Sequence, residues 1–321
     1  TITDESDPQL AGLTDRIKEE ISGRGWHRMG QLILKVGHFD QAEKLYNELR
    51  ENASNDRERA HIYHQLGCLK HDQGEYQQAV TCYEKSIEIN RKTLPQDDAS
   101  LAPTYGNIGG VHNNMGEYSK ALQYYEKSLK ISEISVLPPQ PALANSYCCI
   151  GGVYNSMGEY SKALEYYEKA NKIFEISLPP THPDLAKSYC CIGGAYNSMG
   201  DYSKALEYYE KANKIFEISV PPTHPNLAVS YNNIGQVHNN MGKYSKALEY
   251  YEKSLKIREI SLPQTHPALA NSYCCIGGVY NNMGEYSKAL EYYEKSLKIR
   301  EESLPPIHPD LAVSYSNIGL V

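Results

Sequence analysis

The sequence lacks the features that direct a protein toward nucleic acid or a membrane. Its 321 residues carry a net charge of −7, and Lys alternates with Glu instead of gathering on a basic face. No apolar run reaches the roughly 18 residues of a transmembrane helix, and the opening TITDESDPQL lacks the basic and apolar regions of a signal peptide. We therefore expect a cytoplasmic protein that binds neither nucleic acid nor a membrane.

The sequence also lacks the patterns of a catalytic, cofactor or metal site. The glycine-rich stretch 106–110 contains no P-loop lysine and follows no predicted strand, so it does not predict phosphate binding. No nucleophile, base and orienting group recur in one place. Four histidines recur one repeat apart, too far for the bonds of about 2 Å that a shared zinc ion requires: His182, His224, His266 and His308. We expect no enzymatic activity, no cofactor and no metal, and histidines that begin helices.

Cysteine usage gives no disulfide framework. Six of the eight cysteines form adjacent pairs at one position of a repeat, at Cys148-Cys149, Cys190-Cys191 and Cys274-Cys275. Equivalent positions in neighbouring repeats should be separated by about a helix diameter of 10 Å, whereas a disulfide requires Cα atoms within about 7 Å. We expect reduced thiols in a reducing compartment.

The chain does contain a short sequence segment that is repeated at a fixed period. MGEYSKAL begins at Met115, and near-copies begin every 42 residues at Met157, Met199, Met241 and Met283. Self-similarity at a period of about 20 to 50 residues indicates one array of repeats instead of two ordinary domains.

Each period predicts a hairpin of two helices. The first opens at Pro183, because proline fits the first turn of a helix, and it stops near Gly200, a helix-ending residue. A second apolar stripe then runs from Tyr202 to Ile215. Glycines such as Gly193 recur in the middle of the first helix, at a cost of about 1 kcal/mol against alanine, so we expect close packing there against Ala205 and Tyr209 of the second helix.

The order Tyr147, Ile150-Gly151, Tyr154, Gly158, Tyr160, Ala163, Tyr167 and Ala170 resembles the tetratricopeptide repeat. The resemblance implies an all-α, right-handed α-solenoid, a superhelix of stacked hairpins. We expect a capping helix over residues 1–23 and an array over 24–321. Its repeats begin near residues 24, 61, 102, 144, 186, 228 and 270, and a partial eighth covers 312–321. That unfinished repeat leads us to expect a fragment of a longer protein.

The 42-residue period exceeds the usual period of about 34 residues. That length, with KIREISLPQTHPALANSY from Lys256 to Tyr273, is similar to the repeats of kinesin light chains. The resemblance implies a non-enzymatic adaptor that binds protein or peptide, with a kinesin-type motor complex as one conceivable partner. Two alternatives stay open: an accessory segment of a larger enzyme, such as one with an arginine-specific ADP-ribosyltransferase-like domain, and self-association through the unfinished repeat.

One face of each first helix is polar but almost uncharged. On a wheel at about 100° per residue, Asn232, Asn233 and Gln236 point away from the packing stripe of Tyr231 and Ile234. In tetratricopeptide proteins this face lines a concave groove. Asparagine suits capture of an extended peptide, because an amide both donates to a carbonyl and accepts from an N–H.

The predicted peptide-binding groove consists of Asn107, Asn113, Asn114, Asn145, Cys148, Cys149, Asn155, Lys187, Cys190, Cys191, Asn197, Asn232, Asn233, Gln236, Asn239, Asn240, Asn271, Cys274, Cys275 and Asn281. The alternative is an ordinary solvated helix surface, spread by duplication. Lys187 is the chief cation on this face in repeats three to seven. Repeats one and two are more basic, with Arg24, His27, Arg28, Lys35, His61, His64 and His71. This gradient suits a ligand with one anionic end.

Overall fold

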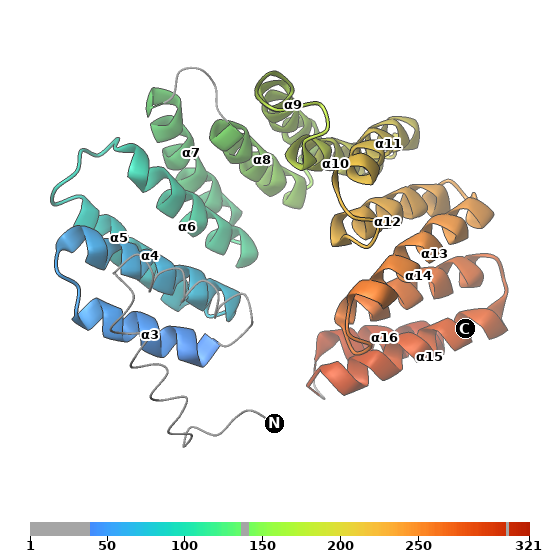
Figure 1. Ribbon diagram of the computed structural model, residues 1–321. Coiled ribbons are helices and arrows are strands. Elements are labelled where there is room, and N and C mark those ends of the chain that lie inside the picture. The colour runs from blue at the N-terminus through green and yellow to red at the C-terminus, as the bar shows by residue number, and fades with distance from the viewer. Residues whose placement is uncertain (1–38, 136–140, 306–307) are drawn as a thin grey trace. The chain divides into compact units, whose positions relative to one another are not determined.

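The computed structural model describes residues 39–135, 141–305 and 308–321, and these residues form only helices (Figure 1). The chain divides into two compact units, Thr1–Ser135 and Val136–Val321, each of which is considered by itself. The capping helix expected over residues 1–23, and the basic residues Arg24, His27, Arg28 and Lys35, lie outside the described residues. No helix in the described ranges is both long and apolar enough to cross a bilayer.

The described helices follow one another as pairs. The first unit contains α3 (Phe39–Glu51), α4 (Asp56–Asp72), α5 (Tyr76–Asn90), the short 3-10 helix η1 (Ala99–Leu101), α6 (Ala102–Asn114) and α7 (Tyr118–Ser135). The second unit contains α8 (Pro141–Ser156), α9 (Tyr160–Ser177), α10 (Pro183–Ser198), α11 (Tyr202–Ser219), α12 (Pro225–Asn240), α13 (Tyr244–Ser261), α14 (Pro267–Asn282), α15 (Tyr286–Ser303) and α16 (Pro309–Gly319). We call the even-numbered helices α4 to α14 first helices, and their partners α5 to α15 second helices. The predicted all-α solenoid of helix hairpins is confirmed.

Local sequence explains where these helices begin and end. His182 is the N-cap of α10, since its ring Nδ1 accepts the backbone N–H of Asp184 at 3.2 Å, and Pro183 occupies the first turn. Gly200 ends the hairpin turn with φ of +80°, which glycine adopts without steric cost. The amide of Asp201 then donates to the carbonyl of Tyr196 at 3.0 Å. The helix-starting role predicted for the histidines is confirmed, because His224, His266 and His308 cap α12, α14 and α16 in the same way.

Each hairpin closes around a glycine in its first helix. A Cβ atom added to Gly193 would lie 3.0 Å from Cδ1 of Tyr209 and 3.2 Å from the backbone oxygen of Ala205, closer than ordinary contact. Ala205 is completely buried and Tyr209 is nearly so. The predicted fit of a bare glycine against a large tyrosine is therefore confirmed, and it recurs as Gly235 against Tyr251.

One position on the second helix fills the junction with the next repeat. It is Phe174 in α9 and Phe216 in α11, both buried, and it becomes Arg258 in α13 and Arg300 in α15. We call it the junction position. The phenylalanines join the apolar clusters with Leu185 and Leu227 of the following first helix.

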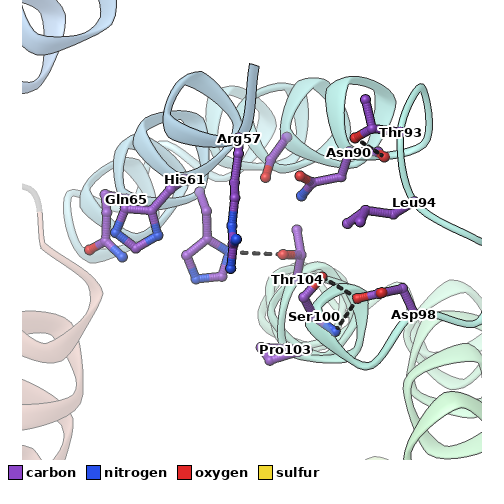
Figure 2. A pocket seen from close by; sticks show the side chains of 12 residues that line it. Arg57, His61, Gln65, Asn90, Thr93, Leu94, Asp98, Ser100, Pro103 and Thr104 are labelled. Carbon is purple, nitrogen blue, oxygen red and sulfur yellow. Dashed lines mark hydrogen bonds between the residues drawn. The ribbon is translucent and has the colours of Figure 1, made fainter. Parts of the chain in front are cut away.

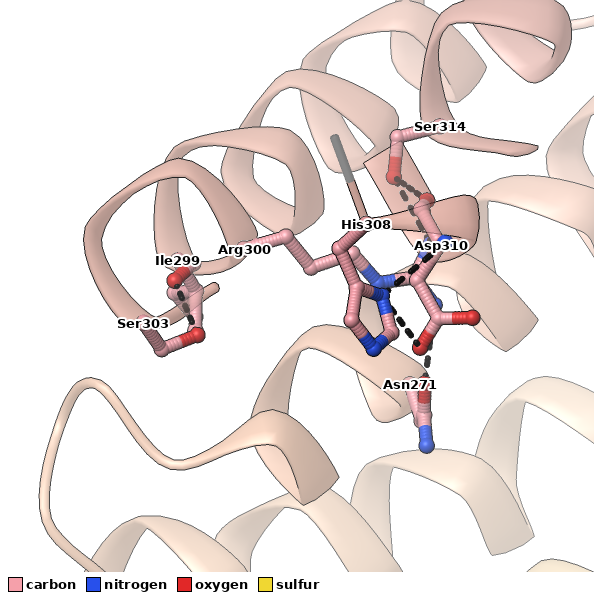
Figure 3. A network of polar contacts seen from close by, with 7 residues as sticks. All are labelled: Asn271, Ile299, Arg300, Ser303, His308, Asp310 and Ser314. Atoms are coloured by element: carbon pink, nitrogen blue, oxygen red, sulfur yellow. Dashed lines mark hydrogen bonds and ion pairs between the residues drawn. The ribbon is translucent and has the colours of Figure 1, made fainter. Parts of the chain in front are cut away.

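At the last of these junctions an arginine replaces apolar packing with hydrogen bonds. Arg300 is buried, and its Nη1 donates to the backbone oxygen of Asp310 at 3.1 Å and to Oγ of Ser314 at 2.7 Å (Figure 3). Its Nη2 donates to Oδ1 of Asn271 at 2.8 Å. Arg300 therefore joins three consecutive helices, α14, α15 and α16. A buried guanidinium is tolerated only where acceptors of this kind surround it.

Candidate functional site

The candidate site in the second unit is the side of the hairpins formed by α8, α10, α12 and α14, which we call the first-helix surface. Helix α12 presents its residues as the wheel predicts. Ile234 and His238 are buried, whereas Gln236 and Asn240 are exposed. The polar face of each first helix therefore points away from the core.

None of the twenty predicted groove residues is buried. Seven are exposed: Asn114, Asn145, Cys149, Lys187, Gln236, Asn240 and Asn271. Thirteen are half-buried: Asn107, Asn113, Cys148, Asn155, Cys190, Cys191, Asn197, Asn232, Asn233, Asn239, Cys274, Cys275 and Asn281. Asn107, Asn113 and Asn114 belong to the first unit, and the others belong to the second. The function of these residues stays a prediction.

Neighbouring first helices are linked by side-chain amides. Nδ2 of Asn240 donates to Oδ1 of Asn197 at 3.1 Å, and Nδ2 of Asn282 donates to Oδ1 of Asn239 at 3.2 Å. Both bonds join residues that are 43 apart, so they run sideways from one first helix to the previous one. Such a bond uses one N–H of a donor that carries two. Part of the polar surface thus holds the repeats together.

Other amides on the same surface are not used by the fold. Asn232, Asn233 and Gln236 on α12 form no side-chain hydrogen bond with the described residues. An amide group can form as many as four hydrogen bonds. These three side chains lie within five residues of one helix, so they offer a compact group of donors and acceptors to a ligand.

The paired cysteines contribute packing more than reactive chemistry. Cys148, Cys190 and Cys191 pack against the apolar clusters of the second unit, and all eight cysteines are free thiols. Burial raises the pKa of Cys191 to about 11 and that of Cys190 to about 12. These thiols remain protonated near neutral pH, whereas nucleophilic attack and metal binding require the thiolate.

A buried guanidinium from a second helix contacts one residue of the first-helix surface. Lys187 forms an ion pair with Asp184 on its own helix at 2.9 Å. Arg300 belongs to a second helix, yet it reaches Asn271, an exposed residue of this surface. That Lys187 is the chief cation on the exposed face of these first helices stays a prediction. The sequence signal for this contact was the replacement of phenylalanine by arginine at the junction position.

In the first unit, histidines replace amides as the hydrogen-bond partners between neighbouring first helices. Nδ2 of Asn114 lies 2.8 Å from Nε2 of His71, and Nδ2 of Asn107 lies 3.4 Å from Nε2 of His64. The other ring nitrogen of His64, Nδ1, lies 2.9 Å from Oγ1 of Thr104. An amide nitrogen only donates, so Nε2 of His64 is the acceptor and its Nδ1 carries the hydrogen. His64 is therefore neutral.

Burial, together with the charge of nearby His61, lowers the pKa of His64 to about 4. The unfolded chain takes up this proton at a pKa near 6.5, so protonation favours the unfolded state. The contribution of neutral His64 to the free energy of unfolding should be complete above pH 6.5. It should fall by about 3 kcal/mol as the pH drops toward 4. Urea titrations at pH 7.5, 6 and 5 will measure this loss, and a His64→Asn variant should show a shallower pH dependence. Equal slopes for the two proteins would contradict the assignment.

The described residues contain no group of three or more His, Cys, Asp or Glu side chains arranged to hold a metal ion. The repeating histidines are instead occupied as N-caps, with Nδ1 of each accepting a backbone N–H. A ring nitrogen that accepts this bond has no lone pair left for a metal.

Sequence comparison establishes the family. The tetratricopeptide repeat profile matches residues 22–92, 100–176, 143–218, 184–260 and 268–321, which together cover most of the chain. The chain belongs to the tetratricopeptide repeat family. None of the curated proteins matches its sequence.

Solved structures show the same fold at low sequence identity. The crystal structure of BtubC (BKLC) from P. vanneervenii is 20% identical with a TM-score of 0.62, and the match covers 73% of this chain and 94% of that one. A putative kinesin light chain with nearly identical TPR-like repeats from Podosopora anserina is 20% identical with a TM-score of 0.55, over 64% and 98% of the two chains. A Rap protein complexed with Competence and Sporulation Factor is 16% identical with a TM-score of 0.61, over 87% and 78%. The similarity to kinesin light chain-like repeats is thus confirmed at the level of the fold.

Proposed function

We propose that this chain is a non-enzymatic scaffold that binds an extended peptide segment of a partner protein along the first-helix surface of the second unit. Tetratricopeptide repeats typically serve in protein–protein interaction. The observation that carries the proposal is the group of unused amides at Asn232, Asn233 and Gln236. An extended peptide exposes an N–H and a carbonyl at every residue, which these amides can satisfy.

The lateral amide bonds support this role by fixing the surface in advance. Asn197 and Asn239 are held by donors from the next first helix. Side chains that are already ordered lose less conformational entropy when a ligand binds. The unused amides of α12 therefore lie on a helix that these bonds join to both of its neighbours, α10 and α14.

The low charge of the surface indicates the kind of peptide. Lys187 is neutralised by Asp184, and the guanidinium of Arg300 is buried and already donates to three acceptors of the fold. A segment that is uncharged along α8 to α14 fits this distribution. The similarity to kinesin light chain-like repeats suits an adaptor that holds such a segment.

The test begins with peptides selected on the full chain from a random displayed library. Affinities of the selected peptides would then be measured by fluorescence anisotropy for a variant with Asn232→Ala, Asn233→Ala and Gln236→Ala. Each neutral hydrogen bond is worth about 0.5 to 1.5 kcal/mol, so losing two or three should weaken binding from tenfold to a few hundredfold, or about 1.4 to 3.5 kcal/mol. Melting should change little, because these amides hold no other part of the fold.

A matched control replaces exposed residues on the second helix of the same hairpin. Lys246→Ala with Glu249→Ala removes two polar side chains from α13, on the other layer. This pair should leave peptide affinity unchanged. If the control weakens binding and the amide variant does not, the ligand lies on the second helices and the proposal is wrong.

A further inference from the structure

The first unit contains a cavity, and none of the residues that line it belongs to the predicted peptide-binding groove. It encloses about 570 Å³ between α4, the end of α5 and the start of α6 (Figure 2). Its lining includes Arg57, Ser86, Asn90, Asp98 and Thr104. A volume of this size is typical of small-molecule sites.

The junction position beside this cavity is occupied by a short side chain. Asn90 occupies the position that holds Phe174 and Phe216 in the second unit, or Arg258 and Arg300 in its later repeats. Those longer side chains fill their junctions, and the two phenylalanines are almost completely buried. Asn90 leaves the equivalent space open and directs an amide toward it.

The wall of the cavity contains polar groups that the fold does not use. Ser86 is 1% exposed, yet its hydroxyl forms no hydrogen bond with the described residues. Thr104 is also buried, and its oxygen accepts the N–H of neutral His64. The hydroxyl hydrogen of Thr104 is thus left to donate. Neither hydroxyl hydrogen is used by the fold, so both can donate to a ligand in the cavity.

The wall also carries one charge of each sign. The guanidinium of Arg57 extends along α4 into the cavity, and Asp98 lies on the far wall (Figure 2). Hydrogen bonds from the hydroxyl and the amide of Ser100 lower the pKa of Asp98, and the charge of Arg57 adds to this effect. Asp98 therefore remains ionised at neutral pH.

We propose that this cavity binds a free α-amino acid, whose carboxylate faces Arg57 and Thr104 and whose ammonium group faces Asp98. The two opposite charges on the wall match the two charges of a zwitterion. Asn90 and Ser86 supply neutral partners for the remaining polar atoms. A ligand with one charge would leave either Arg57 or Asp98 unmatched.

The test titrates each of the twenty common amino acids into the full chain by isothermal calorimetry. Binding of at least one of them is expected, with its N-acetyl derivative and its amide binding at least about tenfold more weakly, since each has lost one charged hydrogen-bonding group. Those derivatives also represent the two ends of a peptide. Equal affinity for either derivative would overturn the assignment to free amino acids, as would the absence of heat from all twenty at millimolar concentration.

Two variants locate the site. Arg57→Gln should weaken binding at least about tenfold, whereas Arg59→Gln should have no effect, because Arg59 pairs with Asp56 outside the cavity. Asn90→Phe should abolish binding by filling the junction as Phe174 does. Circular dichroism would confirm that each variant is folded. Unchanged binding in Arg57→Gln would overturn the proposal whether or not Asn90→Phe folds, and the result is independent of the peptide test on the second unit.

Discussion

Gly193→Leu is expected to destabilise the second unit by more than about 2 kcal/mol. Even a single Cβ at this position would lie 3.0 Å from the ring of Tyr209 and 3.2 Å from the backbone oxygen of Ala205. The ring could turn, but the backbone of α11 moves only if the hairpin opens. Overpacking typically costs 1 to 3 kcal/mol, and in a repeat array the damage extends to both neighbours. A shift of the urea midpoint, followed by circular dichroism, would measure it.

The next residue provides the control. A Cβ added to Gly194 would lie 3.4 Å from the hydroxyl of Tyr209, a normal contact distance. Gly194→Ala should therefore be neutral or should stabilise the protein by up to about 1 kcal/mol, the difference in helix propensity. An unchanged midpoint for Gly193→Leu would show that the hairpin does not close against this glycine.

Arg258→Ala should cost about 3 kcal/mol. Nη1 of Arg258 donates to the backbone oxygen of Ala268 at 3.1 Å and to Oγ of Ser272 at 2.7 Å, and burial lowers the pKa of its guanidinium. Alanine would remove both bonds from the junction between α13 and α14 and would leave a cavity there. Losses of 2 to 5 kcal/mol are usual when a large side chain is truncated in a core, and half-burial of Arg258 places it in the lower part of that range.

The chain itself supplies the matched control for Arg258. Replacing residues 254–258 by the sequence of residues 170–174 exchanges an arginine junction for a phenylalanine junction, including the accompanying Asn171. This exchange should cost less than about 1 kcal/mol, because Ser272 matches Ser188, the partner of Asn171 in the native phenylalanine junction. Calorimetry on both variants would test the pair. If Arg258→Ala is as mild as the exchange, the arginine does not hold the junction.

Much of the fold could be predicted because it depends on contacts within one period. The turn at Gly200, the cap at His182 and the fit of Gly193 against Tyr209 are all local to one hairpin or its ends. Spacing along the sequence fixes such contacts, since a helix places residues three and four apart on one side.

Contacts between periods could not be predicted in the same way. The wheel correctly placed Asn232 and Asn239 on one polar face, but it did not show that Asn239 bonds to Asn282 while Asn232 is unused. That difference depends on the distance and tilt between neighbouring first helices. The reach of Arg300 to Asn271 and the cavity beside Asn90 depend on the same geometry. A change of residue size at the junction position was the only sign of them in the sequence.

Helices α9 and α11 have the same eighteen-residue sequence, YSKALEYYEKANKIFEIS. Removing residues 160–201 would therefore join α8 directly to a copy of its own partner, and α11 would still precede α12. This deletion would remove a whole period while preserving the hairpin and the junction that follows it. Because stability in such arrays comes from each repeat and its nearest neighbours, the shorter chain would retain a folded array. The length of the array can thus change by one period without compensating substitutions at the junctions.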